Sequence, residues 1–198
     1  MKSFRFYELQ KDIFKKMIFY LFGLFFLFSI SNHFTVYAAD TMIDDVVVDD
    51  FTYSINHTKK TATIKSYSGS ATNVQIPENV TYQYDDETNT AAVNTLGIKA
   101  FFENSTLESV SGPSITKIET SQSRKDSTGT TVYDGVFTNC TLLSAVDFPN
   151  VVYVGKHAFS ECSQLRTVNL PKASFIGAHL FRNCTNLGDV SETDGLKQ

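Results

Sequence analysis

The 198-residue sequence has no tryptophan, four prolines and only three cysteines. Its formal net charge of -4 gives no excess of basic residues, and such a composition argues against a surface that binds nucleic acid. The short motifs of common catalytic sites are also missing: there is no Gly-x-Ser-x-Gly, P-loop, His-Glu-x-x-His or pair of dinucleotide-binding glycines. We therefore expect a protein that is not an enzyme and needs no cofactor.

The first 38 residues have the layout of a signal peptide. Residues 1–16 carry five Lys or Arg, and residues 17–30 form a run of 14 residues without a charge. That run is too short to span a bilayer of ~30 Å comfortably but suits the apolar region of a leader, with cleavage after Ala38. The alternative is an uncleaved anchor, because residues 17–39 hold no charged residue. Either way we expect a secreted or cell-surface protein, with membrane contact only through this segment if it stays uncleaved.

The cysteines do not come in the pairs that exported proteins use for disulfides. They are spaced 22 residues apart, and other residue types recur at fixed distances from this position over four copies. Counted from the phenylalanine that opens each copy, leucine follows at six residues and valine at nine. The columns are Phe101, Phe137, Phe159 and Phe181; Asn104, Cys140, Cys162 and Cys184; Leu107, Leu143, Leu165 and Leu187; and Val110, Val146, Val168 and Val190. Such a period predicts a solenoid whose repeated core consists of these columns.

Each copy ends in a segment with the two-residue period of a strand. In residues 165–171, Val168 and Leu170 are expected to point inward, and Thr167 and Asn169 outward. The proline that follows removes a hydrogen-bond donor and ends the ladder. We predict a β-rich solenoid of about four coils, connected by short helical or irregular turns, with the phenylalanine of each coil packed inside.

Two copies are longer than the others. The intervals between successive prolines are 36, 36 and 22 residues, and we place the excess between each proline and the next apolar–glycine step. The inserts, residues 82–95 and 118–131, are polar and poor in large aliphatic side chains. They are expected to be mobile loops outside the stack, on the same side of two successive coils.

The columns of residues 154–171, in the form I-G-x-x-A-F-x-x-C-x-x-L-x-x-V-x-L-P, resemble the BspA-like leucine-rich repeats of bacterial and protist surface proteins. Residues 53–80 resemble the hairpin that opens such arrays. The resemblance implies a leucine-rich-repeat solenoid that is secreted or displayed at a surface, binds other molecules and in some members is an adhesin. The expected organisation is a signal peptide (1–38), an acidic linker (39–50), a capping hairpin with a half-repeat (51–76) and the repeat array (77–198).

His157 and His179 each stand five residues before a cysteine, which raises the possibility of a metal site. Zinc needs four converging N or S ligands, whereas we expect the cysteines inside and the histidines on an outward turn. The same column holds Lys99 and Gly135, which share no chemistry with histidine. We interpret the pairs as marks of the repeat, expect no metal site and expect all three cysteines to be reduced.

The expected partner is a protein, or an extracellular-matrix or cell-surface ligand, bound for adhesion. The candidate contact residues point outward from the strands: Glu108, Ser111, Asp147, Arg166, Asn169 and Asp189. The two inserts are an alternative recognition site, and we slightly prefer the strand face. The other functions considered are a structural spacer or the N-terminal fragment of a longer surface protein, and then a secreted enzyme.

Overall fold

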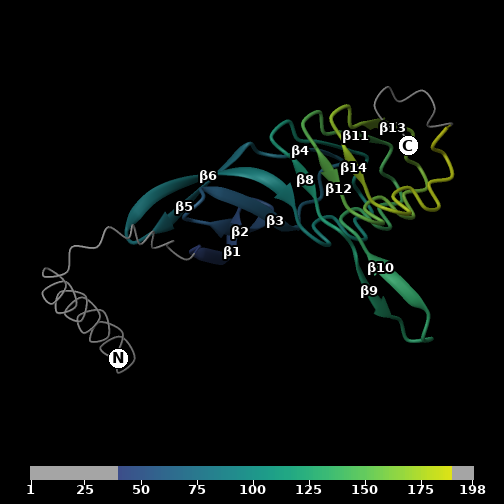
Figure 1. The fold of residues 1–198 in the computed structure, drawn as a ribbon, viewed down its shortest axis with the longest axis horizontal. Coiled ribbons are helices and arrows are strands. Elements are labelled where there is room, and N and C mark those ends of the chain that lie inside the picture. The colour runs from purple at the N-terminus through teal and green to yellow at the C-terminus, as the bar shows by residue number, and fades with distance from the viewer. Residues whose placement is uncertain (1–39, 189–198) are drawn as a thin grey trace, which may run out of the picture. The chain divides into compact units, whose positions relative to one another are not determined.

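A computed structural model describes residues 40–188, and all its regular elements are strands (Figure 1). Between them lie turns and irregular segments, without a helix in this part of the chain. The expected signal peptide and the positions of Asp189 and Val190 lie outside the described residues. The strands are β1 (Met42–Val48), β2 (Phe51–Asn56), β3 (Thr61–Tyr67), β4 (Asn73–Gln75), β5 (Asn79–Tyr84), β6 (Glu87–Leu96), β7 (Ser109–Ser111), β8 (Lys117–Ile118), β9 (Gln122–Lys125), β10 (Thr131–Asp134), β11 (Ala145–Asp147), β12 (Tyr153–Val154), β13 (Thr167–Asn169) and β14 (Phe175–Ile176).

A four-stranded parallel sheet, here called the front sheet, takes one short strand from each coil in the order β13-β11-β7-β4. Its central residues pair in one register, which joins Val74, Val110, Val146 and Val168. All four valines are buried, while most of their neighbours along the strands face outward. Chain segments that lie 22 or 36 residues apart are therefore stacked as equivalent coils, and the predicted repeat solenoid is confirmed.

A second sheet, here called the back sheet, has the order β1-β2-β3-β6-β8-β12-β14, with β5 paired to β6. Strands β2 and β3 are antiparallel, which confirms the capping hairpin that opens the array. From β3 onward the ladder is parallel, and its buried residues are Ile64, Leu96, Ile118 and Val154. Ile176 continues the register on β14 but is exposed. Each coil therefore contributes one strand to each sheet, and the apolar side chains fill the space between them.

Most of residues 39–50, which were expected to form an acidic linker, form a strand in the structure. Residues 42–48 form β1, an edge strand that pairs antiparallel with β2. Its Ile43, Val46 and Val48 pack against the core, whereas the Asp45 carboxylate stays exposed and pairs with Lys65 Nζ at 2.7 Å. The segment forms a strand despite its acidic residues, because the open edge of β2 offers hydrogen bonds to its backbone and an apolar surface to its aliphatic side chains.

The two inserts are hairpins, so the prediction of loops at one equivalent step is wrong. The first contains the end of β5 and most of β6, and it buries Tyr82, Ala91 and Val93 in the core. The second forms the separate two-stranded sheet of β9 and β10. Ile118 pairs with Val154, so the extra residues of the second insert come after the back strand of their coil and are Ser121–Asp134. The first insert instead comes before Leu96, which pairs with Ile118 in the back sheet.

The phenylalanine column forms a stack along the core. Adjacent ring centroids of Phe101, Phe137 and Phe159 are 5.0 Å apart, and that of Phe181 follows at 5.7 Å. The first three rings are fully buried, and Phe181 and Leu187 are partly buried. Apart from the partly buried Asn104, the remaining described positions of the core columns are buried as well: Leu107, Leu143, Leu165, Val110, Val146, Val168, Cys140, Cys162 and Cys184.

Each cysteine thiol has the same partner, the backbone carbonyl of the phenylalanine in the preceding coil. The Sγ···O distances are 2.9 Å for Cys140, 3.1 Å for Cys162 and 3.0 Å for Cys184. All three are free cysteines. The first copy follows a half-repeat without a phenylalanine, and its Asn104 instead accepts hydrogen bonds from the N–H groups of its own turn at Thr106 and Leu107. The 22-residue cysteine period thus reflects a small buried donor that links successive coils.

Candidate ligand-binding site

The front sheet places three of the predicted contact residues in one row. Asp147 is in register with Ser111 on β7 and with Asn169 on β13. The Asn169 side-chain amide donates to Asp147 Oδ1 at 2.7 Å, which fixes both side chains on the surface. Asp189, the next member expected in this region, lies outside the described residues.

A second row brings Glu108 and Arg166 to the same face. Their coils are joined through Ser144, whose N–H donates to the Glu108 carbonyl at 2.8 Å and whose carbonyl accepts from Arg166 N–H at 2.9 Å. Together they border a shallow depression of about 400 Å³, the front hollow, lined by Glu108, Leu142, Ser144, Ala145, Gln164, Arg166 and Thr167. Leu142 is 46% exposed there, so an apolar side chain shares the hollow with an acidic and a basic one.

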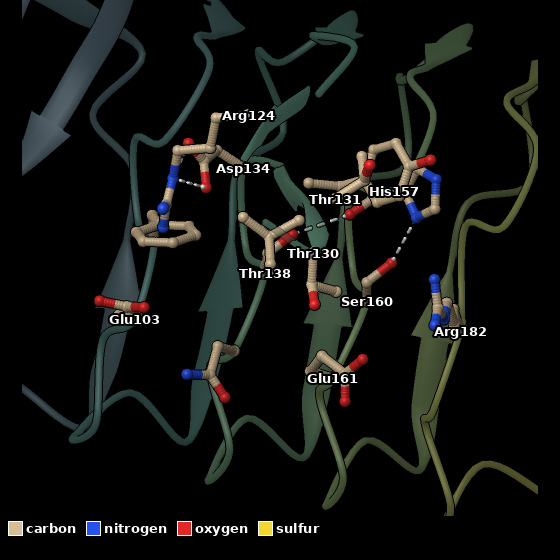
Figure 2. Close-up of a pocket in the computed structure, with 14 residues that line it drawn as sticks. Glu103, Arg124, Thr130, Thr131, Asp134, Thr138, His157, Ser160, Glu161 and Arg182 are labelled. Atoms are coloured by element: carbon tan, nitrogen blue, oxygen red, sulfur yellow. Dashed lines mark hydrogen bonds and ion pairs between the residues drawn. The ribbon is translucent and has the colours of Figure 1, made fainter. Parts of the chain in front are cut away.

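A second depression of about 410 Å³, the hairpin hollow, lies beside β10 (Figure 2). The hairpin is attached to the coils through the buried carboxylate of Asp134. This group pairs with Lys99 Nζ at 2.7 Å and with Arg124 Nε at 2.9 Å. Removal of either partner would leave a buried charge with less compensation, so the arrangement holds the hairpin in one position.

An aromatic stack forms the second attachment of the hairpin. The Tyr133 ring lies 3.9 Å from that of His157, nearly parallel to it, and His179 follows at 5.1 Å. His157 is only 5% exposed, so its expected place on an open outward turn is wrong. Tyr133 covers it from an insert that precedes it in the chain. Burial lowers the pKa of His157, and the neighbouring charges of His179 and Arg182 act in the same direction.

Three of the four members of the histidine column share a left-handed backbone conformation, and Gly135 is the exception. Lys99, His157 and His179 have φ values of 66°, 55° and 59°. The left-handed region is uncommon for residues other than glycine, and histidine is among those enriched there. Glycine serves a different purpose nearby: a Cβ on Gly155 would lie 2.3 Å from Thr120 N, so close approach of the preceding coil requires glycine.

Metal-ligating groups do not converge in the described part of the chain. Residues 40–188 contain no group of three or more His, Cys, Asp or Glu side chains that could hold an ion. The His157 ring nitrogen Nδ1 is 3.1 Å from Ser160 Oγ, whereas the Cys162 thiol donates to a core carbonyl. The two members of this His–Cys pair therefore make separate hydrogen bonds.

The sequence matches the profile of the BspA type leucine rich repeat region over residues 66–198, in six copies. The chain belongs to this family. Six copies exceed the four copies and the half-repeat counted from the columns. Among residues 40–188, no helix is long and apolar enough to cross a membrane.

Two solved structures show the same fold. A leucine rich cell surface protein from Faecalibacterium prausnitzii A2-165 is 23% identical, with a TM-score of 0.54, over 76% of this chain and 42% of that one. A leucine-rich repeat protein from Bacteroides capillosus ATCC 29799 is 24% identical, with a TM-score of 0.56, over 74% of this chain and 96% of that one. The chain thus spans under half of the first protein and nearly all of the second. Comparison with curated proteins found no match.

Proposed function

We propose that this member of the repeat family is a non-catalytic adhesion module, secreted or displayed at the cell surface, that binds a protein or extracellular-matrix ligand through its front sheet. The observation that carries the proposal is the front hollow, where Glu108, Leu142 and Arg166 from successive coils lie on one face. Exposed apolar surface beside separated opposite charges suits recognition of another protein, because burial supplies affinity and the charges fix orientation.

The rigidity of this face also favours binding. Its strands are held by parallel ladders on both sides of β11, and the Asp147–Asn169 hydrogen bond orders the outward side chains. A ligand that meets a preformed surface loses less conformational entropy on binding than one that must order a loop. The proposed contact residues are therefore Glu108, Ser111, Asp147, Arg166 and Asn169, together with Asp189 beyond the described residues.

Placement outside the cell is supported by two features. Residues 1–38 have the composition of a signal peptide. The similar Faecalibacterium prausnitzii structure is described as a cell surface protein. A ligand outside the cell follows from that placement, and a matrix or envelope protein is the partner of this kind that we propose.

Capture on immobilised extracellular-matrix and cell-envelope proteins tests the proposal. We expect the chain without residues 1–38 to bind at least one of them, and Arg166→Ala to weaken that binding about tenfold, the effect of a contact near the centre of an interface. Lys172→Ala is the matched control, because Lys172 is an exposed cation outside the front hollow. Absence of capture, or equal loss in both variants, would contradict the proposal.

A further inference from the structure

The free edge of β10 offers unused backbone hydrogen bonds. The hairpin turn closes with Gly129 N–H donating to the Asp126 carbonyl at 3.0 Å and Asp126 N–H donating to the Thr130 carbonyl at 3.0 Å. From this pair, the antiparallel alternation directs the backbone groups of Val132 and Asp134 toward β9. Those of Thr131 and Tyr133 point away from β9, and no hydrogen bond joins them to any other group among residues 40–188.

This edge borders the hairpin hollow. All five residues from Thr130 to Asp134 line it, together with residues of the coil turns, including Asn139 and Glu161. The edge is held in place by the Asp134 ion pairs and by the stacking of Tyr133 on His157. An isolated two-stranded hairpin is marginally stable in water, so these attachments keep the edge available to a ligand.

The formal charges around the hollow balance, three acidic against three basic with Lys99 counted, but the carboxylates of Glu103 and Glu161 make no ion pair among residues 40–188. The cationic groups of Arg124 and Lys99 are already paired with the buried carboxylate of Asp134. Glu103 and Glu161 lie on equivalent turns with Asn139 between them, and all three have φ values between 57° and 64°. Arg182 is the remaining cation of the lining. Two carboxylates along one wall would favour a basic side chain over an acidic one.

We propose that the β10 edge and the hairpin hollow form a second binding site, which accepts an extended, basic peptide segment of a protein partner as an added β-strand. The backbone groups of Thr131 and Tyr133 supply up to four main-chain hydrogen bonds, and Glu103 and Glu161 select for lysine or arginine. The site is separate from the front hollow, since the two share no lining residue.

The opposite edge of the hairpin provides the matched control. By the same alternation, the backbone groups of Ser123 and Lys125 also point outward, from β9. Neither residue lines the hairpin hollow, and a lysine on an edge strand discourages strand addition. Proline at either outward position removes one donor without breaking the hydrogen bonds between β9 and β10.

The probe is a fluorescein-labelled seven-residue peptide that alternates valine and lysine between terminal threonines, and anisotropy measures its binding to the chain without residues 1–38. We expect Thr131→Pro to weaken binding about tenfold and Ser123→Pro to leave it unchanged. Replacing lysine by glutamate in the probe, or methylating its alternate backbone nitrogens, should abolish binding to the wild-type chain. Bound probe should also slow amide exchange at Thr131 and Tyr133.

Failure of the lysine probe to bind at millimolar concentration would overturn the proposal, as would equal binding of the methylated probe. Equal weakening by the two proline variants would show that the hairpin edge next to the hollow has no special role. The test is independent of the proposed function, because Arg166→Ala should leave binding of the probe unchanged while it weakens capture of the matrix ligand.

Discussion

At the scale of the residue, the repeat period identifies buried positions better than exposed ones. A residue that recurs every 22 positions meets its equivalents in neighbouring coils, so the columns of Phe159 and of Cys162 could be placed inside from the sequence. His157 could not, because it is covered by Tyr133 from an insert outside the period. The signal available in the sequence was the residue type itself, since histidine tolerates the left-handed backbone found at His157 and His179.

Phe159 gives the first prediction at this scale. Its ring is fully buried and stacks on Phe137 at 5.0 Å, so Phe159→Ala should lower the free energy of unfolding by about 3–5 kcal/mol. Phe175→Ala is the matched control, because that ring is 47% exposed and should contribute under about 1.5 kcal/mol through its stacking on Tyr153. Thermal melts of both variants measure the difference. Similar melting temperatures for the two would contradict the inward position of the phenylalanine column.

Cys140 gives a prediction about pH. Burial raises the pKa of its thiol to about 12 from an ordinary value of 9.0. Because the folded-state pKa is the higher one, the thiol contributes its full stability below pH 9, and this contribution is lost as pH rises toward 12. Urea unfolding at a series of pH values should show a loss of up to about 1.4 kcal/mol per pH unit above pH 9 that is missing in Cys140→Ala. Identical pH dependence in the two proteins would place the thiol in contact with water.

At the scale of the element, the polar composition of the inserts predicted loops, whereas both inserts form hairpins. Apolar and polar residues alternate from residue 80 up to Asp85-Asp86, whose φ values of 50° and 61° match a two-residue hairpin turn. That alternation was a strand signal within a polar segment. The start of the second insert was misplaced because Val132 and Ile118 both suit the apolar step, and only the pairing of Ile118 with Val154 distinguishes them.

The two hairpins should respond differently to deletion. Removal of Ser121–Asp134 joins Thr120 to Gly135 and restores the 22-residue spacing, so the melting temperature should fall by only about 2–8 °C. Removal of Tyr82–Thr95 takes out the buried Val93 and most of β6, and should abolish cooperative unfolding. Circular dichroism during heating measures both. A variant without Tyr82–Thr95 that still folds, or a variant without Ser121–Asp134 that does not, would contradict the assigned pairing.

At the scale of the whole molecule, the repeat period predicts the fold, but it does not predict the ligand. Each coil contacts mainly its neighbours through the two ladders, so a conserved spacing is enough to specify a leucine-rich-repeat solenoid. Outward residues have no such constraint, since solvent accepts many side chains at the same position. The sequence therefore predicted the front-sheet contact residues only from the outward direction of their side chains. The front hollow could not be predicted in this way, because its lining comes from three coils that lie side by side in the structure.

Hydroxyl-radical footprinting of the captured complex tests most directly whether the front sheet contacts the ligand. Leu142 in the front hollow and Phe175 on β14 are matched reporters, with exposed fractions of 46% and 47%. Mass spectrometry measures their oxidation with and without the matrix ligand. The proposed function predicts that oxidation of Leu142 falls severalfold on binding while that of Phe175 is unchanged. Protection of Phe175 with Leu142 still fully oxidised would contradict it.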